Sequence, residues 1–593
     1  MEDFGAKWKS IEKLPLIALW SVLGIVAWVC MQAFYEFHFY YVEQLQLFIY
    51  NKTFLSGLLY SFGGLSEIIS RWLIQFFIHP YIGALITTLL LLTVAMLMQS
   101  LAKKINRNGP SLLIPLLTAI SLFFLHLNHN YYVAGTIALI LTLASLLICI
   151  HMKRPVTKIA ATTACACLLF WWAGSVAFLF VLTIITWQLL TQRKQIVHAL
   201  VPLLLLLILA YLSVERGLVG DYQQVFLPTL YFHPKLTPPS LFYYPWGLLF
   251  LLVLFASLPW KRKMARKRLY LIFCCQMAVA CAVLCFLLPK YGQLSSAQYK
   301  KLDYYARMGR WNDIVEERKK PIQNLLHLYY LHIALMETNQ LANQFMRFDQ
   351  KGVSGLVPIT SGGLPSLIVC NELNFTLGDI AAAQHYAFEG NINISKTGSP
   401  RLYLRLIQTN LINGEYRVAE KYIRLLEQTH FYKKWATAQR RFLYNDQAVE
   451  EDPLLGKKRR GLPKENYLLA ATDPIDRVQL LAKADRNNTA AVDYLASIFL
   501  FEKQMTPFKE LIEAHYSTEV SPTALPERFQ EAIMIIYEDD PQAWARFGIS
   551  KQVMSNYENY RQLFLENSDK ENLADILYPP FGHTYWYYFM FYN

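Results

Sequence analysis

Nine long apolar runs occupy the first half of the chain and restrict its fold more than any other feature. They cover residues 14–35, 81–100, 111–127, 131–150, 156–171, 174–190, 197–213, 241–259 and 269–288. A helix of about 20 apolar residues matches the hydrocarbon thickness of a bilayer. We therefore expect about nine transmembrane helices within residues 1–290. The block 156–190 is divided at Trp171 to Ser175, because one helix of that length would overshoot the bilayer.

The composition of the whole chain agrees with membrane insertion. Of 593 residues, 54% are hydrophobic and 17% are charged, whereas soluble domains average about 25% charged residues. The net charge of +13 could suggest nucleic-acid binding, but many of the basic residues lie in short loops between apolar runs. In such loops they act as topology signals, so we expect no nucleic-acid partner.

These loop charges also predict the orientation of the chain. Basic residues follow the second, fourth, sixth and eighth runs: Lys103, Lys104 and Arg107, then Lys153, Arg154 and Lys158, then Arg193 and Lys194, then the cluster within 261–268. Lys and Arg accumulate on the cytoplasmic side of a membrane. The N-terminus is therefore expected in the cytoplasm and residues 291–593 on the outside, which is the periplasm if this is a bacterial inner-membrane protein.

Residues 291–593 show the pattern of paired helices. Glycine turns at Gly309, Gly378 and Gly414 each precede a second helix, and the last two lie 36 residues apart. Five residues after these two glycines stand Ala383 and Ala419. This spacing resembles the tetratricopeptide repeat, in which a small residue packs the second helix against the first. We expect an all-α fold with a soluble α-solenoid, whose concave surface holds a protein or peptide partner.

The first external loop, residues 36–80, contains the most informative polar residues. Leu45, Phe48 and Ile49 follow one helical spacing, and Glu43, Gln46 and Tyr50 follow another. This pattern predicts an amphipathic helix lying on the membrane surface. Residues 65–78, with Glu67 and Arg71 one turn apart, predict a second such helix. The spans themselves hold almost no charged residues, which disfavours an ion-coupled transporter.

A first external loop of interfacial helices with a carboxylate just after the first span resembles membrane glycosyltransferases of the C superfamily. These enzymes transfer sugars from polyprenyl-phosphate donors. Several spans followed by a repeat-containing tail also resemble the transmembrane O-mannosyltransferases with tetratricopeptide repeats. The chain further resembles an uncharacterised family of large membrane proteins from Bacteroidota, and that resemblance implies no activity.

The glycosyltransferase resemblance implies roles for particular side chains. Glu43 or Glu36 would be the general base that takes the proton of the acceptor hydroxyl. Gln46 and the external cations or imidazoles would bind the donor and its leaving phosphate; these are Arg71, His126, His129, Arg216 and Lys235. No paired acidic signature of the metal-dependent branch is present, so we expect no cofactor, and a divalent metal stays open only as an alternative without support from the sequence.

Interpretations without a catalytic or binding role remain open for the same residues. Glu43 can be a solvated carboxylate on an interfacial helix, and His126 and His129 can be loop-cap or membrane-belt residues. Two other functions also remain. One is a membrane scaffold or assembly factor that presents the solenoid to a partner, and the other is a transporter or flippase of a lipid-linked substrate.

Overall fold

The computed structural model describes residues 14–106, 112–152, 154–192, 196–259, 266–317, 324–348, 351–358, 363–394, 397–465, 467, 473–516 and 524–592. Within these residues the fold is all-helical. No strand occurs there, and one isolated β-bridge pairs Tyr131 with Phe232. Backbone contacts divide the chain into two compact units, residues 1–300 with 428–431 and residues 301–427 with 432–593.

The first unit contains the predicted apolar helices and the loops between them. Its helices are α2 (Leu14–Glu43), α3 (Lys52–Leu59), α4 (Gly64–Ile74), η1 (Gln75–Ile78), α5 (Ile82–Ile105), α6 (Leu113–Leu127), α7 (Ala134–His151), α8 (Pro155–Trp172), α9 (Val176–Thr191), α10 (Ile196–Glu215), α11 (Tyr222–Phe226), η3 (Pro228–Tyr231), η4 (Ser240–Tyr243), α12 (Tyr244–Ser257) and α13 (Arg266–Tyr291). The next helix, α14 (Leu294–Arg307), begins in the first unit and ends in the second.

Six of the described helical segments are long and apolar enough to cross a membrane: Ile17–Glu43, Ile82–Ile105, Ala134–His151, Pro155–Trp172, Ser240–Ser257 and Tyr270–Tyr291. Three further apolar segments are shorter, namely Leu113–Leu127, Val176–Thr191 and Leu200–Glu215. Each of the nine apolar runs therefore coincides with a helix. The predicted break between the fifth and sixth runs is observed, because α8 ends at Trp172 and α9 begins at Val176. Gly174 stands between them with a φ of 89°, a conformation that favours glycine.

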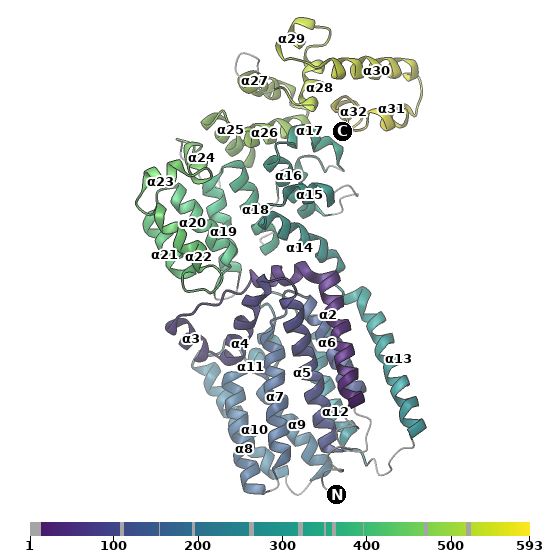
Figure 1. Ribbon diagram of the computed structural model, residues 1–593, viewed down its shortest axis with the longest axis vertical. Helices are drawn as coiled ribbons and strands as arrows, with labels where there is room; N and C mark the ends of the chain where they lie inside the picture. Colours follow the sequence, from purple (N-terminus) through teal and green to yellow (C-terminus); the bar gives the residue numbers. More distant parts are fainter. Residues whose placement is uncertain are drawn as a thin grey trace. The chain divides into compact units, whose positions relative to one another are not determined.

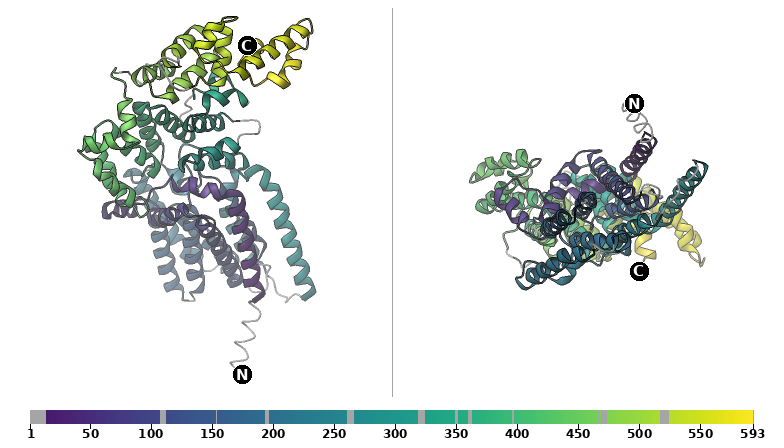
Figure 2. Two further views of the ribbon diagram at one scale, coloured as in Figure 1. Left: turned by 45° about the horizontal axis from the view of Figure 1, so that its top comes forward. Right: turned by 90° about the horizontal axis from the view of Figure 1, so that it is seen from below.

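The core of this unit lies where the long helices run alongside one another (Figure 1). Helix α5 contacts α2, α6, α7 and α12, and α9 contacts α7, α8, α10 and α12. Fully buried side chains from three of these helices, among them Val94, Leu143 and Phe180, fill the space between them. Helix α13 lies at the edge of the unit (Figure 2), and only 11% of its apolar window is buried.

The first external loop differs from its prediction in one segment. Helix α2 ends at Glu43, and residues 47–50 have no regular structure. The prediction of an amphipathic helix over residues 43–50 is therefore wrong. Leu45, Leu47, Phe48 and Ile49 are all buried. Side chains on both sides of this segment are thus buried. The spacing of its apolar residues therefore does not reflect a helix with one exposed face. The second predicted helix is present as α4 and η1.

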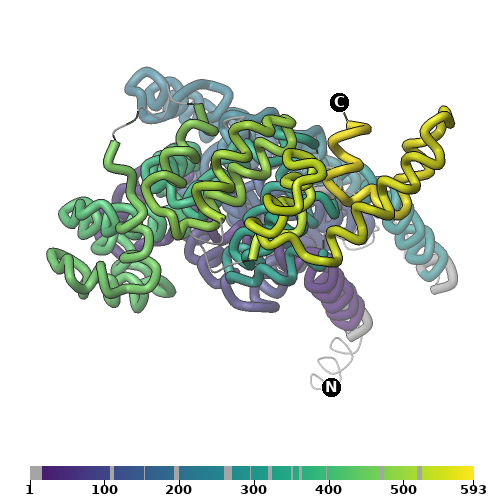
Figure 3. Tube along the Cα trace, turned by 90° about the horizontal axis from the view of Figure 1, so that it is seen from above, coloured from purple at the N-terminus to yellow at the C-terminus, as the bar shows by residue number. Residues whose placement is uncertain are grey.

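The second unit is a chain of short helices. They are α15 (Trp311–Glu317), α16 (Leu325–Glu337), α17 (Leu341–Gln344), η5 (Phe345–Arg347), η6 (Gly352–Gly355), α18 (Leu364–Leu377), α19 (Ile380–Asn393), α20 (Pro400–Ile412), α21 (Tyr416–Leu426), α22 (Lys433–Gln439), η7 (Arg440–Phe442), α23 (Asp446–Glu451), α24 (Leu455–Arg460), α25 (Pro474–Ala484), α26 (Thr489–Phe501), α27 (Met505–Tyr516), α28 (Glu527–Ile536), α29 (Pro541–Arg546), α30 (Lys551–Asn567), α31 (Leu573–Phe581) and α32 (Tyr585–Phe591). Helices that are consecutive in the sequence lie next to one another from α18 to α21, as the colour passes from teal to green in Figure 3.

The predicted glycine turns of this unit are present. Gly378 connects α18 to α19 with a φ of 93°, and Gly414 connects α20 to α21 with a φ of 76°. Ala383 and Ala419, which follow these turns, have no exposed surface. The side-chain amide of Asn371 in α18 donates to the carbonyl oxygen of Ala383 at 2.7 Å. The paired helices are therefore joined by close packing at a small residue and by a buried hydrogen bond.

Some of the basic loop residues used to predict topology cannot be placed. Arg107, Lys153, Arg193, Lys194 and residues 261–265 lie outside the part of the chain that the structure describes.

Candidate functional site

The site is built on a bend in the first long helix. Tyr35 has non-helical backbone angles (φ −133°, ψ 20°), which break α2 into two helical segments. The second segment, residues 36–43, carries His38 and Glu43, each 3% exposed. Glu43 is therefore a buried carboxylate and not a solvated one, whereas Glu36 is only partly buried. The next residues are also buried, and Gln46 is 7% exposed.

The closest partner of His38 comes from a distant part of the sequence. Nζ of Lys300, in α14, lies 2.9 Å from Nδ1 of His38. Lys300 is 2% exposed, and this burial lowers the pKa of its ammonium group to about 7. Removing water from a cation disfavours the charged form, so Lys300 titrates near neutral pH and gains from any anion that comes within reach.

Two further histidines complete this group: His126 in the last turn of α6 and His129 in the loop between α6 and α7. The ring of Tyr41, which follows His38 in the same helical segment, meets the ring of His129 edge-on, with centroids 5.2 Å apart. The same tyrosine ring lies 6.0 Å from Nζ of Lys300. Burial first, and then the nearby Lys300 and His233, lower the pKa of His129 to about 3, so this imidazole is neutral at physiological pH. We call His38, His126, His129 and Lys300 the imidazole–lysine cluster.

His126 joins the cluster to a hydrogen-bonded network. His126 Nε2 lies 2.8 Å from the hydroxyl oxygen of Thr136, and the hydroxyl of Tyr131 lies 3.0 Å from the same oxygen. The ring of His126 also lies close enough to His38 for an electrostatic interaction. His126 thus has a defined hydrogen-bond partner and lies inside the polar cluster, not in a solvated loop cap.

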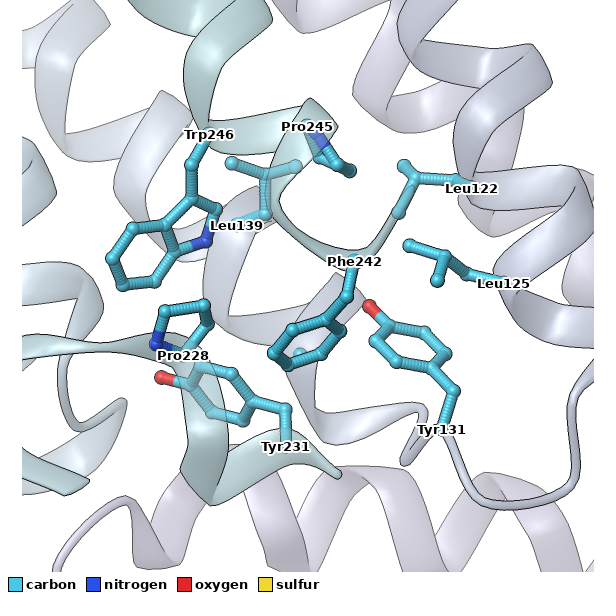
Figure 4. A pocket seen from close by; sticks show the side chains of 10 residues that line it. Leu122, Leu125, Tyr131, Leu139, Pro228, Tyr231, Phe242, Pro245 and Trp246 are labelled. Atoms are coloured by element: carbon cyan, nitrogen blue, oxygen red, sulfur yellow. The ribbon is translucent and has the colours of Figure 1, made fainter. Parts of the chain in front are cut away.

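An apolar hollow adjoins this network on the side of Tyr131 (Figure 4). The side chains of Tyr131, Tyr231, Phe242 and Trp246 converge on it, and leucines from α6 and α7 also line it. The space between these side chains holds about one water molecule.

Arg71, which the sequence suggested as a phosphate ligand, has a structural role in this arrangement. Its Nε and Nη2 atoms donate to Oε1 of Glu67 at 3.0 and 2.6 Å, and Nη1 reaches the carbonyl of Leu47 at 3.5 Å. The side chain is 2% exposed. It therefore ties α4 to the irregular segment after Glu43.

The other two suggested cations lie at the surface. Arg216 follows the end of α10 and is exposed. Lys235 is also exposed, although its backbone N–H donates to Nδ1 of His233 at 3.3 Å. The buried cluster therefore contains two of the five predicted cations and imidazoles, His126 and His129.

Sequence reasoning missed Lys300 and did not single out His38. Lys300 stands beside Lys301 in a helix that continues into the soluble half, where charged residues usually face water. One signal was present: Tyr299, Leu302 and Ala306 follow the spacing of a buried helix face, and Lys300 lies at the edge of that face. Its pairing with His38 has no local sequence signal, because it is a contact between distant segments.

The arrangement can bind an anion through hydrogen bonds from a buried ammonium group and neutral imidazoles, which are strong when one partner is charged. Among the described residues, no group of three or more His, Cys, Asp or Glu side chains is placed to hold a metal ion.

Fold and site together define an all-helical protein with several helices able to cross a membrane and a buried imidazole–lysine cluster at one end of them. The chain belongs to a family of unknown function, DUF6057, whose sequence profile matches residues 12–592. Comparisons with curated proteins and with solved structures found no match.

Proposed function

We propose that this protein is a membrane glycosyltransferase that takes a sugar from a polyprenyl-phosphate donor at the outer face of a bacterial inner membrane. In this proposal all nine apolar helices span the bilayer, the N-terminus is cytoplasmic and the second unit is periplasmic. The six long segments and the three shorter ones support the span count, and the basic loops after even-numbered spans support the orientation.

One observation carries the proposal: a single buried helical segment, residues 36–43, bears both a carboxylate and a member of the imidazole–lysine cluster. Glu43 and His38 are both 3% exposed, and His38 contacts Lys300. Glycosyl transfer from a phosphate donor needs a base for the acceptor hydroxyl and cations for the leaving phosphate. Both kinds of group are present on or beside this segment.

The proposed step balances with these groups. Glu43 accepts the proton of the acceptor hydroxyl while the hydroxyl oxygen forms a bond to the anomeric carbon of the sugar. The bond from that carbon to the phosphate oxygen breaks, and the phosphate leaves with the electron pair. Lys300 and the imidazoles stabilise the developing negative charge. The second unit binds the acceptor.

The test uses the full-length protein in lipid nanodiscs and a panel of polyprenyl-phosphate donors that carry radiolabelled sugars. The readout is release of the label from lipid to acceptor or water. Because Glu43→Gln keeps the shape of the side chain but removes the base, the rate should fall about 10²–10⁴-fold. Glu36→Gln, on the same segment, is the matched control and should keep most of the rate. Full activity of Glu43→Gln, or no turnover of any donor by the wild type, would overturn the proposal.

A second candidate, a membrane scaffold, is favoured by the paired helices α18 to α21. We propose that these helices form tetratricopeptide-like repeats and that their surface binds a protein or peptide. Complementation of a deletion strain separates the two functions. A scaffold tolerates Glu43→Gln and Glu36→Gln but fails when residues 291–593 are removed, whereas the enzyme fails with Glu43→Gln at normal membrane abundance.

A further inference from the structure

The first external loop contains a helix that the proposed transfer reaction does not use. Helix α3 follows the segment that carries Glu43 and lies at the margin of the first unit (Figure 1). The loop connects two segments that are able to cross a membrane, Ile17–Glu43 and Ile82–Ile105. Both ends of the loop therefore lie at the boundary of the membrane that these segments cross.

The sequence of α3 forms an apolar face and a polar face. Residues three and four positions apart share one face of a helix. By this spacing the apolar face consists of Phe54, Leu55, Leu58 and Leu59, and the polar face consists of Lys52, Thr53, Ser56, Gly57 and Tyr60, which directly follows the helix. Lys52 is the only charged residue within α3. An amphipathic helix with a cation on its polar face is the type that lies on a membrane surface.

The rest of the protein covers only part of the apolar face. Leu58 is buried, and α4 is the helix that packs against α3. Leu59 is 39% exposed, and Phe54 and Leu55 are both partly exposed. Apolar side chains that remain uncovered next to one another mark a surface that contacts a membrane or another protein.

Hydrogen bonds fix the N-terminal end of α3. The side chain of Asn51 accepts the N–H of Thr53 at 2.7 Å and donates to Oε1 of Gln428 at 2.5 Å. The N–H of Tyr50 donates to the carbonyl oxygen of Gln428 at 2.7 Å. Gln428 belongs to the first unit, together with the next three residues. The apolar face of α3 is therefore presented in a defined direction.

The groups around α3 favour lipid as the occupant of this face. Lys52 is exposed, so its ammonium group can contact lipid phosphates. Tyr50 and Tyr60, on either side of the helix in the sequence, and Trp72 of α4 are also exposed. Tyrosine and tryptophan are enriched where a protein meets the boundary between membrane and water.

We propose that α3 lies on the membrane surface, with its uncovered apolar side chains against the acyl chains and Lys52 among the lipid phosphates. The occupant of the apolar face is the bilayer and not a partner protein. Because Gln428 and Tyr50 are joined beside the start of α3, this contact also holds the end of the segment after Glu43 at a defined depth. The proposal applies whether the protein is an enzyme or a scaffold.

The experiment places a fluorescent dansylalanine at one position at a time in the full-length protein, in nanodiscs of phosphatidylcholine and phosphatidylglycerol. Leu55 and Leu59 probe the apolar face, and Thr53 and Gly57 probe the polar face. A Cβ atom added at Gly57 meets no other part of the described structure within 4 Å, so this position accepts the probe. The two quenchers are a phospholipid with a nitroxide near the top of its acyl chain and iodide in the water.

The two faces should respond in opposite ways. The nitroxide lipid should quench the probes at Leu55 and Leu59 about twofold or more strongly than those at Thr53 and Gly57, because opposite faces of a helix lie about 10 Å apart. Iodide should quench the probes at Thr53 and Gly57 more strongly, since the polar face of a surface helix meets water.

A pair of substitutions on α3 tests the same contact. With the probe at Leu55, Leu59→Asp should reduce quenching by the nitroxide lipid about twofold, because a carboxylate is disfavoured against acyl chains. Thr53→Asp, on the polar face of the same helix, is the matched control and should leave the quenching unchanged.

Equal quenching of the two faces by the nitroxide lipid would overturn the inference, as would stronger iodide quenching at Leu55 and Leu59 than at Thr53 and Gly57. Protection of Leu55 and Leu59 from both quenchers would place a protein, a second copy included, on this face and would also overturn it. The comparison of the two faces does not require Leu59→Asp to fold. None of these measurements depends on sugar transfer.

Discussion

Nζ of Lys300 lies 2.9 Å from Nδ1 of His38, although 262 residues separate them in the sequence. When Lys300 is protonated it donates to this nitrogen, so the proton of a neutral His38 lies on Nε2. The contact joins the middle of α14 to the segment that carries Glu43. It places a titrating cation inside the first unit.

This contact predicts how stability depends on pH. The pKa of Lys300 is lowered to about 7 in the folded protein, but a lysine in the unfolded chain has a pKa of about 10.4. Between about pH 7 and pH 10 the unfolded state binds more protons, so stability should rise with pH in this window. Lys300→Met should weaken that rise, as measured by thermal unfolding of the detergent-solubilised protein at pH 7 and pH 9.

Lys301→Met is the control, because Lys301 is partly exposed and pairs with Glu317 at 2.5 Å. It should leave the rise with pH unchanged. An identical pH dependence in the wild type and Lys300→Met would contradict the assignment.

A second titrating group lies in the second unit. Burial raises the pKa of Asp493 to about 6, and its Oδ1 accepts the hydroxyl of Tyr516 at 2.6 Å. The folded state therefore binds more protons than the unfolded state between about pH 4 and pH 6, and Asp493 costs stability as the pH rises through that range. Asp493→Asn keeps an acceptor for Tyr516 and removes the charge.

Asp493→Asn should stabilise the protein at pH 8 by about 1–3 kcal/mol and have little effect at pH 4. The measurement is the thermal unfolding midpoint at both pH values. Asp476→Asn in α25, where the carboxylate is exposed, should change neither midpoint. A gain at pH 4 equal to that at pH 8 would exclude the titration of Asp493 as its cause.

The close packing of α19 on α18 predicts a position-specific response to large side chains. Ala383 has no exposed surface, so Ala383→Trp should overpack the helix pair and destabilise it by about 1–3 kcal/mol. Ala381 lies on the same helix and is exposed, and Ala381→Trp should be tolerated. Chemical denaturation followed by circular dichroism measures both variants, and equal losses would argue against a helix pair packed through Ala383.

The proposed topology predicts the side on which reporter fusions fold. Fusions at Asn106 and at Ala265, which lies outside the described residues, should report cytoplasm, because basic loops remain on that side. Fusions at Gly220 and Gly456 should report periplasm. A cytoplasmic signal at Gly456 would require an even number of spans and would remove the proposed periplasmic acceptor domain.

The sequence predicted the helices of the first unit well, because an apolar run of about 20 residues must satisfy its own backbone hydrogen bonds in a bilayer. Gly174 was recognisable as a break within the 156–190 block, and its positive φ agrees with that role. Gly378 and Gly414 were equally visible, since a helix that ends in a left-handed residue usually ends in glycine.

The polar site was harder to predict. Glu43, His126 and His129 could be selected from the sequence because they are polar residues in or beside predicted external loops. The prediction of a helix after Glu43 was wrong because Leu45, Leu47, Phe48 and Ile49 are all buried. Periodicity identifies a helix only when one of its faces is exposed. Arg71 could have been assigned to Glu67 from their four-residue spacing, since such pairs interact on a helix.

The bend at Tyr35 divides α2 into an apolar segment with exposed side chains and a buried segment with polar side chains. Residues before the bend present exposed apolar side chains such as Ile17, Ile25 and Val29, whereas His38 and Glu43 after it are buried. Spans tilt to match the thickness of the surrounding bilayer. In the proposed topology the segment before Tyr35 lies in the bilayer and the segment that carries His38 lies at its outer edge. The interruption at Tyr35 then gives these two segments separate directions, so that the direction of the membrane span does not by itself fix the position of His38 beside Lys300.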